Sequence, residues 1–165
     1  MQVPRRKPGK YTHEKPDPHL TPEKFDEMKN KLANLKKILP SAAIEVKRLS
    51  EMGDFSENAA YQMAKARLRG INDNILLIEE HLKHAVIITP DKNTETLQIG
   101  HSVTIHIEDK QITYLILGSS EVDPAKGVIS HNSPLGSALI GHKVGDTVRL
   151  QMRGKEVKCR IMKIE

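Results

Sequence analysis

The sequence contains no tryptophan and few other aromatic residues. Phe, Tyr and Trp make up 3% of its 165 residues, and Tyr114 is the only one of them beyond residue 85. A pocket that binds proline-containing peptides needs an apolar floor with several aromatic rings. The C-terminal half is therefore a poor candidate for a prolyl isomerase or a peptide-binding chaperone.

Other absences exclude further classes of protein. Cys159 is the only cysteine, so no disulfide can form within the chain. No apolar run approaches the ~18 residues of a membrane span, and the N-terminus lacks the apolar stretch of a signal peptide. The sequence also lacks a glycine-rich phosphate loop and a nucleophile elbow. We expect a cytoplasmic protein that contacts no membrane and is not an enzyme by itself.

The positive charge is concentrated at the N-terminus. The net charge is +5, of which residues 1–20 carry +3 and residues 21–85 and 86–165 carry +1 each. A protein that binds duplex nucleic acid by electrostatics alone spreads basic charge over a folded face, and this distribution does not favour that class. Because four prolines lie among the basic residues of the first segment, we expect residues 1–20 to be a disordered basic arm.

Residues 21–86 carry two apolar heptad runs separated by a short polar break. Both runs step alternately by three and four residues, the spacing of one buried stripe on a helix. Thr21-Pro22 has the chemistry of a helix start, and the first run stays in phase past Pro40. Because neither helix can bury its stripe alone and the break at 53–58 allows only a reversal, the pattern predicts an antiparallel coiled-coil hairpin. The stripe positions are Phe25, Met28, Leu32, Leu35, Leu39, Ala42, Val46 and Leu49, then Tyr61, Ala64, Leu68, Ile71, Ile75, Ile78, Leu82 and Ala85.

Beyond Pro90 the period of the apolar residues changes from seven to two. Four segments alternate apolar and polar residues, which is typical of half-buried strands. Ser133-Pro134 can cap a short helix that runs to about Ile140. Residues 87–165 are therefore predicted to form a small, mostly antiparallel sheet with one helix, which makes the chain an α+β protein. The alternating positions are Val103, Ile105 and Ile107; Ile112, Tyr114 and Ile116; Val148, Leu150 and Met152; and Val157, Cys159 and Ile161.

Two carboxylates, Asp54 and Glu57, lie in the break between the predicted helices. Their spacing fits a capping box, in which each side chain satisfies a free backbone N–H. The same pair could bind a divalent ion or orient a water molecule inside another molecule's active site. Two carboxylates are too few for a closed Mg²⁺ site, which takes about six oxygen ligands. The histidines show no matching metal-ligand spacing, so we predict no metal site that belongs to this chain alone.

Basic residues follow directly behind this break on both predicted helices. On the second helix no acid lies between Glu57 and Asp73. Such a cluster could bind a phosphate backbone, such as that of RNA, while the tip acts on one phosphodiester linkage. A solvated helix face is the alternative. The residues of this basic patch are Lys47, Arg48, Lys65, Arg67 and Arg69.

Residues 53–61, Gly-Asp-Phe-Ser-Glu-Asn-Ala-Ala-Tyr, resemble the G-D-x-x-E-N-A-x-Y signature of the Gre family of bacterial transcript cleavage factors, GreA and GreB. The resemblance covers residues 21–165. Residues 56–58 and 65–69 resemble GreB more than GreA, and the choice between the two stays open. Further matches, in order and at the family's spacing, are Ile129-Ser130, Ser133-Pro134, Ala138-Leu139-Ile140-Gly141 and Gly145-Asp146.

This resemblance implies a transcription elongation factor whose hairpin enters the secondary channel of RNA polymerase. Asp54 and Glu57 would help to hold the polymerase's second Mg²⁺ and the attacking water, so that the polymerase cleaves backtracked RNA. The factor would have no cofactor of its own and would share this Mg²⁺. The family's C-terminal domain is FKBP-like and binds at the channel entrance, which assigns polymerase contact to Ser133, Pro134 and Leu135. The expected partners are RNA polymerase and the 3′ end of the nascent RNA, and we expect a monomer.

The sequence departs from the family pattern at Ala60, where the family usually has an acid, at Ser137, where GreA-like members usually have Arg, and in residues 1–20. None of these departures removes the tip carboxylates. One alternative is an inhibitor that binds the channel without stimulating cleavage, which the retained carboxylates disfavour. The others are a coiled-coil scaffold, in which the two acids only cap a helix, and the prolyl isomerase or chaperone considered above.

Overall fold

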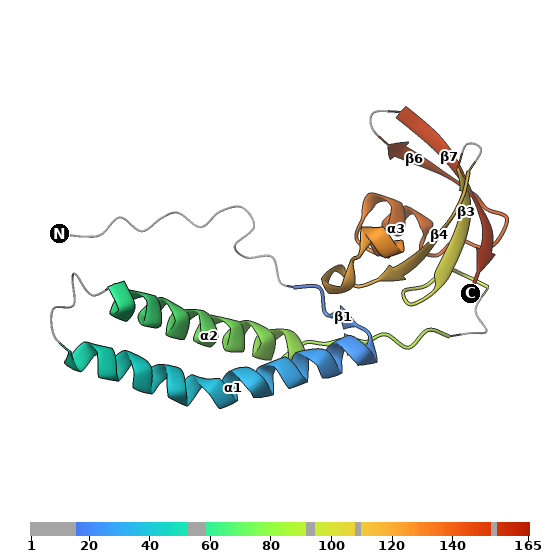
Figure 1. Cartoon of the computed structure of the whole chain (residues 1–165). Helices are drawn as coiled ribbons and strands as arrows, with labels where there is room; N and C mark the ends of the chain where they lie inside the picture. Colours follow the sequence, from blue (N-terminus) through green and yellow to red (C-terminus); the bar gives the residue numbers. More distant parts are fainter. Residues whose placement is uncertain (1–15, 53–58, 92–94, 108–109, 153–154) are drawn as a thin grey trace, which may run out of the picture.

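A long helical hairpin and a five-stranded sheet form the two parts of the molecule (Figure 1). The computed structural model describes residues 16–52, 59–91, 95–107, 110–152 and 155–165. The α+β prediction is confirmed. The elements in chain order are β1 (His19–Leu20), α1 (Pro22–Glu51), α2 (Ala59–Lys83), β2 (Val86–Ile87), β3 (Ser102–Ile107), β4 (Lys110–Leu117), the 3₁₀ helices η1 (Ser119–Glu121) and η2 (Pro124–Lys126), β5 (Val128–Ser130), α3 (Pro134–Leu139), β6 (Thr147–Met152) and β7 (Lys155–Ile164).

Helices α1 and α2 pair along the predicted apolar stripe. All sixteen predicted stripe positions are buried or half-buried, because each helix covers the stripe of the other. Thr21 caps α1 as expected, since its hydroxyl accepts a hydrogen bond from the Lys24 amide at 3.2 Å. The helix continues through Pro40. Ion pairs between Lys36 and Glu79 at 2.6 Å and between Glu45 and Arg67 at 3.7 Å join the two helices across their exposed faces.

The sheet has the order β5-β4-β3-β7-β6. The pairs β3–β4, β3–β7 and β6–β7 are antiparallel, whereas β5 runs parallel to β4. The prediction of a mostly antiparallel sheet is therefore confirmed. The parallel edge strand β5 was not predicted, because a strand of three residues is too short to show a period of two. The four predicted strands and the short helix α3 are confirmed. Their inward side chains form one core; the buried members are Leu97, Val103, Ile105, Ile116, Leu139, Val148, Leu150, Cys159 and Ile161.

The hairpin and the sheet domain meet at the base of the hairpin. Strand β1 pairs in parallel with β2, so that the segments before α1 and after α2 lie side by side. The Leu20 side chain is fully buried there. The prediction of a disordered arm over residues 1–20 is therefore wrong for residues 16–20, since backbone pairing and burial order a segment whose composition indicated disorder. Residues 1–15 lie outside the described residues.

The carboxylate of Asp17 joins this segment to the sheet domain. One oxygen accepts the Ser119 amide at 2.7 Å and the Ser119 hydroxyl at 2.9 Å, and the other accepts the His19 amide at 3.1 Å. Burial raises the pKa of Asp17, but hydrogen bonds from Ser119 and His19 lower it more, to about 2. The backbone carbonyl of Asp17 also lies 2.8 Å from the buried His81 ring of α2. One residue thus contacts both parts of the molecule.

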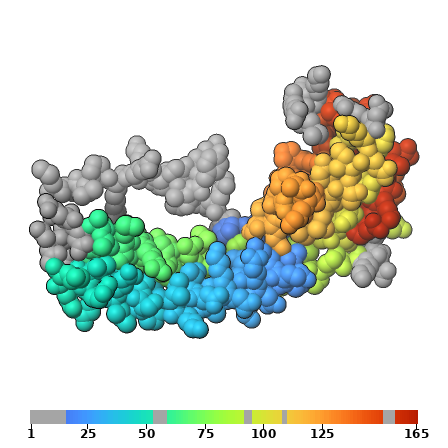
Figure 2. Space-filling view, viewed as in Figure 1, coloured from blue at the N-terminus to red at the C-terminus, as the bar shows by residue number. Residues whose placement is uncertain are grey.

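Two further contacts fix the same junction. Glu121 of η1 accepts the amide of Thr21 at 2.8 Å and its hydroxyl at 2.5 Å, directly at the start of α1. Gly118 lies so close to β1 that a Cβ there would overlap the carbonyl oxygen of His19. Figure 2 shows the result, a sheet domain seated at one end of the long hairpin.

We expect Gly118→Ala to lower the free energy of unfolding by about 1–3 kcal/mol, because the new methyl group overlaps fixed backbone. The matched control is Gly70→Ala in α2, where a Cβ meets nothing within 4 Å. This control should gain about 0.5–1 kcal/mol from helix propensity. Denaturant unfolding of both variants measures the difference. Equal effects would contradict the close approach at Gly118.

We expect Asp17→Asn to cost about 2 kcal/mol of stability at neutral pH. Because the pKa of Asp17 is lowered from 3.8 to about 2 in the folded chain, the ionised carboxylate stabilises the fold fully above pH 3.8. That contribution is lost as the pH falls toward 2. Denaturant unfolding in EDTA-containing buffer at several pH values should therefore show parent and variant converging in acid.

The control for this comparison is Asp26→Asn, which changes an exposed acid on α1. It should stay within about 0.5 kcal/mol of the parent. A difference between parent and Asp17→Asn that does not change with pH would show that the charge of Asp17 is unimportant.

Candidate functional site

The candidate site is the end of the hairpin that points away from the sheet domain (Figure 1). Helix α1 ends at Glu51 and α2 begins at Ala59. The predicted tip carboxylates Asp54 and Glu57 lie outside the described residues, so their capping and metal-binding roles stay predictions. The pairing of α1 with α2 brings both flanks of the break together at this end.

Directly behind the break, the surface between the two helices forms a hollow of about 430 Å³. Two basic residues, Arg48 on α1 and Arg67 on α2, line it together with one acidic residue, Glu45. Arg67 reaches Glu45 at 3.7 Å; the Arg67 side chain is largely exposed and that of Glu45 is half-buried. With two cations to one anion, the hollow suits an anionic group such as a phosphate. The remaining lining residues are Leu49, Ala60, Met63 and Ala64.

The other residues of the basic patch lie outside this hollow. All five residues of the basic patch are exposed. The Lys65 ammonium lies 5.8 Å from the centre of the Tyr61 ring. Among the described residues, Lys47, Lys65 and Arg69 do not line the hollow. The structure thus brings together Arg48 and Arg67, one from each helix, and spreads the remaining three over the hairpin surface.

The predicted docking turn begins α3 at the sheet domain. The Ser133 hydroxyl accepts the Gly136 amide at 3.0 Å and donates to the Ser130 carbonyl at 2.6 Å. Leu135 is half-buried against the core, while Pro134 is exposed. Of the three predicted residues, Ser133 and Leu135 therefore hold the turn in place, and Pro134 presents the most accessible surface.

The hollows of the molecule bear on the prolyl-isomerase alternative. One of about 530 Å³ lies at the junction, and one of about 340 Å³ lies beside His81 and His84. In the part of the chain that the structure describes, no Phe, Tyr or Trp lines either of them.

Cys159 is fully buried, and burial raises the pKa of its thiol, which disfavours a nucleophilic role.

One cluster was missed by the sequence reasoning. Asp17, His19 and His131 bring three possible metal-ligand atoms within 4.8 Å of one another. The spacing of these residues gives no signal, because His131 lies 112 positions after His19 in the sequence. None of the described helices is long and apolar enough to cross a bilayer.

Two family models match this chain, one for each part. The model described as "Transcription elongation factor, N-terminal" matches residues 19–87, and the model described as "Transcription elongation factor, GreA/GreB, C-term" matches residues 92–165. Together they cover the hairpin with its β1–β2 base and the sheet domain.

Among curated proteins, the chain is similar to transcription elongation factors GreA. It is 38% identical over 149 residues to that of Macrococcus caseolyticus, covering 88% of this chain and 94% of the relative. It is 36% identical over 150 residues to that of Geobacillus kaustophilus, covering 88% and 95%.

Solved structures give weaker matches. GreA factor homolog 1 (Gfh1) of Thermus thermophilus is 24% identical, covers 90% of this chain and 99% of its own, and superposes with a TM-score of 0.42. A GreA/GreB factor from Nitrosomonas europaea is 21% identical, covers 73% and 93%, and superposes with a TM-score of 0.40.

We expect Ser133→Ala to lower the free energy of unfolding of the sheet domain by about 1 kcal/mol, because it removes the N-cap of α3. The matched control is Ser137→Ala, an exposed position in the same helix. It should change stability by less than about 0.5 kcal/mol. Denaturant unfolding followed by circular dichroism compares the two. A loss in Ser133→Ala no greater than that in Ser137→Ala would show that the cap contributes little.

Proposed function

This chain belongs to the GreA/GreB family of transcription elongation factors, and from that premise we propose that it binds RNA polymerase and stimulates the polymerase's own cleavage of backtracked RNA. The observation that carries the proposal is the 38% identity to a curated GreA over 88% of the chain, which spans both the hairpin and the sheet domain. The expected site of action is the secondary channel of the polymerase.

The shape of the hairpin supports this role. At 1.5 Å per residue, the 30 residues of α1 make a rod of about 45 Å. A rod of two paired helices is narrow enough to enter a channel and stiff enough to carry its end to a distant site. The sheet domain is much wider than the rod and would stay at the channel entrance (Figure 2).

The chemistry would reside in the two tip carboxylates. Asp54 and Glu57 would complete the coordination of a Mg²⁺ ion that the polymerase also holds, and would orient the attacking water. A two-metal centre stabilises both the attacking and the leaving oxygen of a phosphodiester. In this proposal the polymerase supplies the remaining ligands and the catalysis, so the factor itself is not an enzyme and brings no cofactor to the cleavage reaction.

The basic hollow behind the tip would hold the RNA. Arg48 and Arg67 approach from different helices and face one hollow, which suits contact with a phosphate of the displaced 3′ segment. Lys47, Lys65 and Arg69 would add attraction from the surrounding surface. The turn at Ser133, Pro134 and Leu135 would contact the polymerase at the entrance. We propose a monomer that works with the polymerase in the bacterial cytoplasm.

The competing functions predict different behaviour. An inhibitor would bind the polymerase and reduce cleavage, and a coiled-coil scaffold would lose stability but no activity when its tip acids are changed. A prolyl isomerase would need an aromatic pocket, and the hollows described above contain no Phe, Tyr or Trp among the described residues.

The decisive experiment measures RNA cleavage in stalled, backtracked elongation complexes with Mg²⁺ near neutral pH. The parent should shorten the RNA from its 3′ end. The double variant Asp54→Ala/Glu57→Ala should bind the polymerase with similar affinity and leave cleavage at the unassisted rate, because the donated carboxylates are gone.

The matched control is Asp73→Ala, which removes an exposed carboxylate from the same hairpin away from the tip. It should stimulate cleavage as the parent does. Cleavage below the unassisted rate with the parent would establish the inhibitor instead. Full stimulation by the double tip variant would overturn the proposed role of the two acids.

A further inference from the structure

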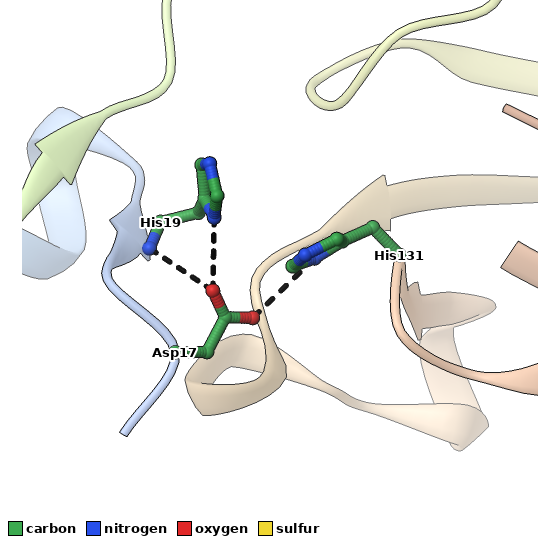
Figure 3. A group of neighbouring side chains, drawn as sticks. All are labelled: Asp17, His19 and His131. Carbon is green, nitrogen blue, oxygen red and sulfur yellow. Dashed lines mark hydrogen bonds and ion pairs between the residues drawn. The ribbon is translucent and has the colours of Figure 1, made fainter. Parts of the chain in front are cut away.

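Three side chains with metal-binding chemistry meet where the hairpin joins the sheet domain (Figure 3). Asp17 and His19 come from the segment that leads into α1, and His131 follows β5. The Nδ1 atom of His19 lies 2.9 Å from one carboxylate oxygen of Asp17, and Nδ1 of His131 lies 3.3 Å from the other. The two imidazole rings are nearly perpendicular, with their centres 4.9 Å apart.

We propose that Asp17, His19 and His131 form a binding site for one divalent transition-metal ion, of which Zn²⁺ fits the ligand set best. Two imidazole nitrogens and one carboxylate oxygen are a known zinc set, with water in the fourth position. Mg²⁺ and Ca²⁺ prefer oxygen ligands alone and do not suit two imidazoles.

The spacing of the ligand atoms supports this site. Bonds of about 2.0–2.1 Å in a tetrahedral arrangement place neighbouring ligand atoms about 3.4 Å apart. The nitrogen–oxygen distances here are 2.9 and 3.3 Å and run to the two different oxygens of the carboxylate, and one ligand atom from each residue lies within 4.8 Å of the other two. To bind an ion, the two rings and the carboxylate would turn so that both nitrogens and one oxygen face it.

The surroundings of the carboxylate match those of a metal ligand. The amide and hydroxyl of Ser119 hold one oxygen of Asp17 at 2.7 and 2.9 Å, and such outer partners orient a ligating carboxylate. The Asn132 amide nitrogen lies 3.5 Å from the same oxygen. The described residues that face the carboxylate thus offer hydrogen-bond donors, and none brings a second negative charge.

Access and burial are also suitable. The Asp17 side chain is only 5% exposed, whereas that of His19 is 33% exposed, so an ion and its water can enter from the His19 side. The Nδ1 atom of His19 lies 2.9 Å from an Asp17 carboxylate oxygen, whereas Nδ1 of His131 also lies 3.4 Å from the carbonyl oxygen of Leu117. Each imidazole would bind the ion through an unprotonated Nδ1, with its one proton on Nε2.

A bound ion would connect the base of the hairpin to the sheet domain. His19 precedes α1, and His131 lies between β5 and α3, so metal bonds to both would restrain the angle between the two parts. This inference does not depend on the proposed function, because the cluster lies at the end of the hairpin opposite the tip (Figure 1).

The test titrates the full chain, freed of metal with EDTA and exchanged into a non-chelating buffer, with Zn²⁺ in a calorimeter. Co²⁺ serves as a second probe because its visible spectrum reports tetrahedral nitrogen and oxygen ligands. The parent should bind one Zn²⁺ saturably and melt at a higher temperature with Zn²⁺ than with Mg²⁺. His131→Gln and His19→Gln should each weaken binding at least about tenfold.

The controls separate this site from other histidines. His106→Gln changes an exposed histidine of β3, and His13→Gln changes one in residues 1–15; both should bind Zn²⁺ as the parent does. Circular dichroism in EDTA checks that all variants are folded. The proposal is overturned if the parent shows no saturable binding, or if His131→Gln binds and is stabilised by Zn²⁺ like the parent.

Discussion

The pairing of β1 with β2 is the contact on which the arrangement of the whole molecule depends. Each helix of the hairpin packs on its partner, and the sheet domain has a separate core of its own. Only the segments at the hairpin base determine how the two parts are joined. Backbone hydrogen bonds from Val86 to Pro18 and from Ile88 to Leu20 close this base, and Asp17 attaches it to the sheet domain.

Strong periodicity made most of the fold predictable. Sixteen stripe positions sufficed for the hairpin because burial along a helix repeats regularly, and four alternating runs sufficed for the main strands. The strands that were missed, β1, β2 and β5, have only two or three residues each. Elements that short exist because neighbouring backbone offers hydrogen bonds, and no local pattern records which distant segment will be beside them.

Part of the candidate site was also predictable from the sequence, and part was not. Asp54, Glu57 and the five basic residues could be named from the sequence because they interrupt or border a regular pattern. Arg48 and Arg67 face one hollow because of the register in which the two helices pair. The ion pairs Lys36–Glu79 and Glu45–Arg67 join the helices in that register. The meeting of Asp17 with His131 depends on the tertiary fold alone, since the two residues belong to different parts of the molecule.

The length of the hairpin turns its base into the fulcrum of a lever. With an arm of about 45 Å, a rotation of about 10° at the junction would move the far end by about 8 Å, several times the length of a metal–ligand bond. A reactive group carried at that end is therefore positioned as accurately as its base is held. The close approach of Gly118 to His19 and the hydrogen bonds of Asp17 and Glu121 therefore help to determine where the far end of the hairpin lies.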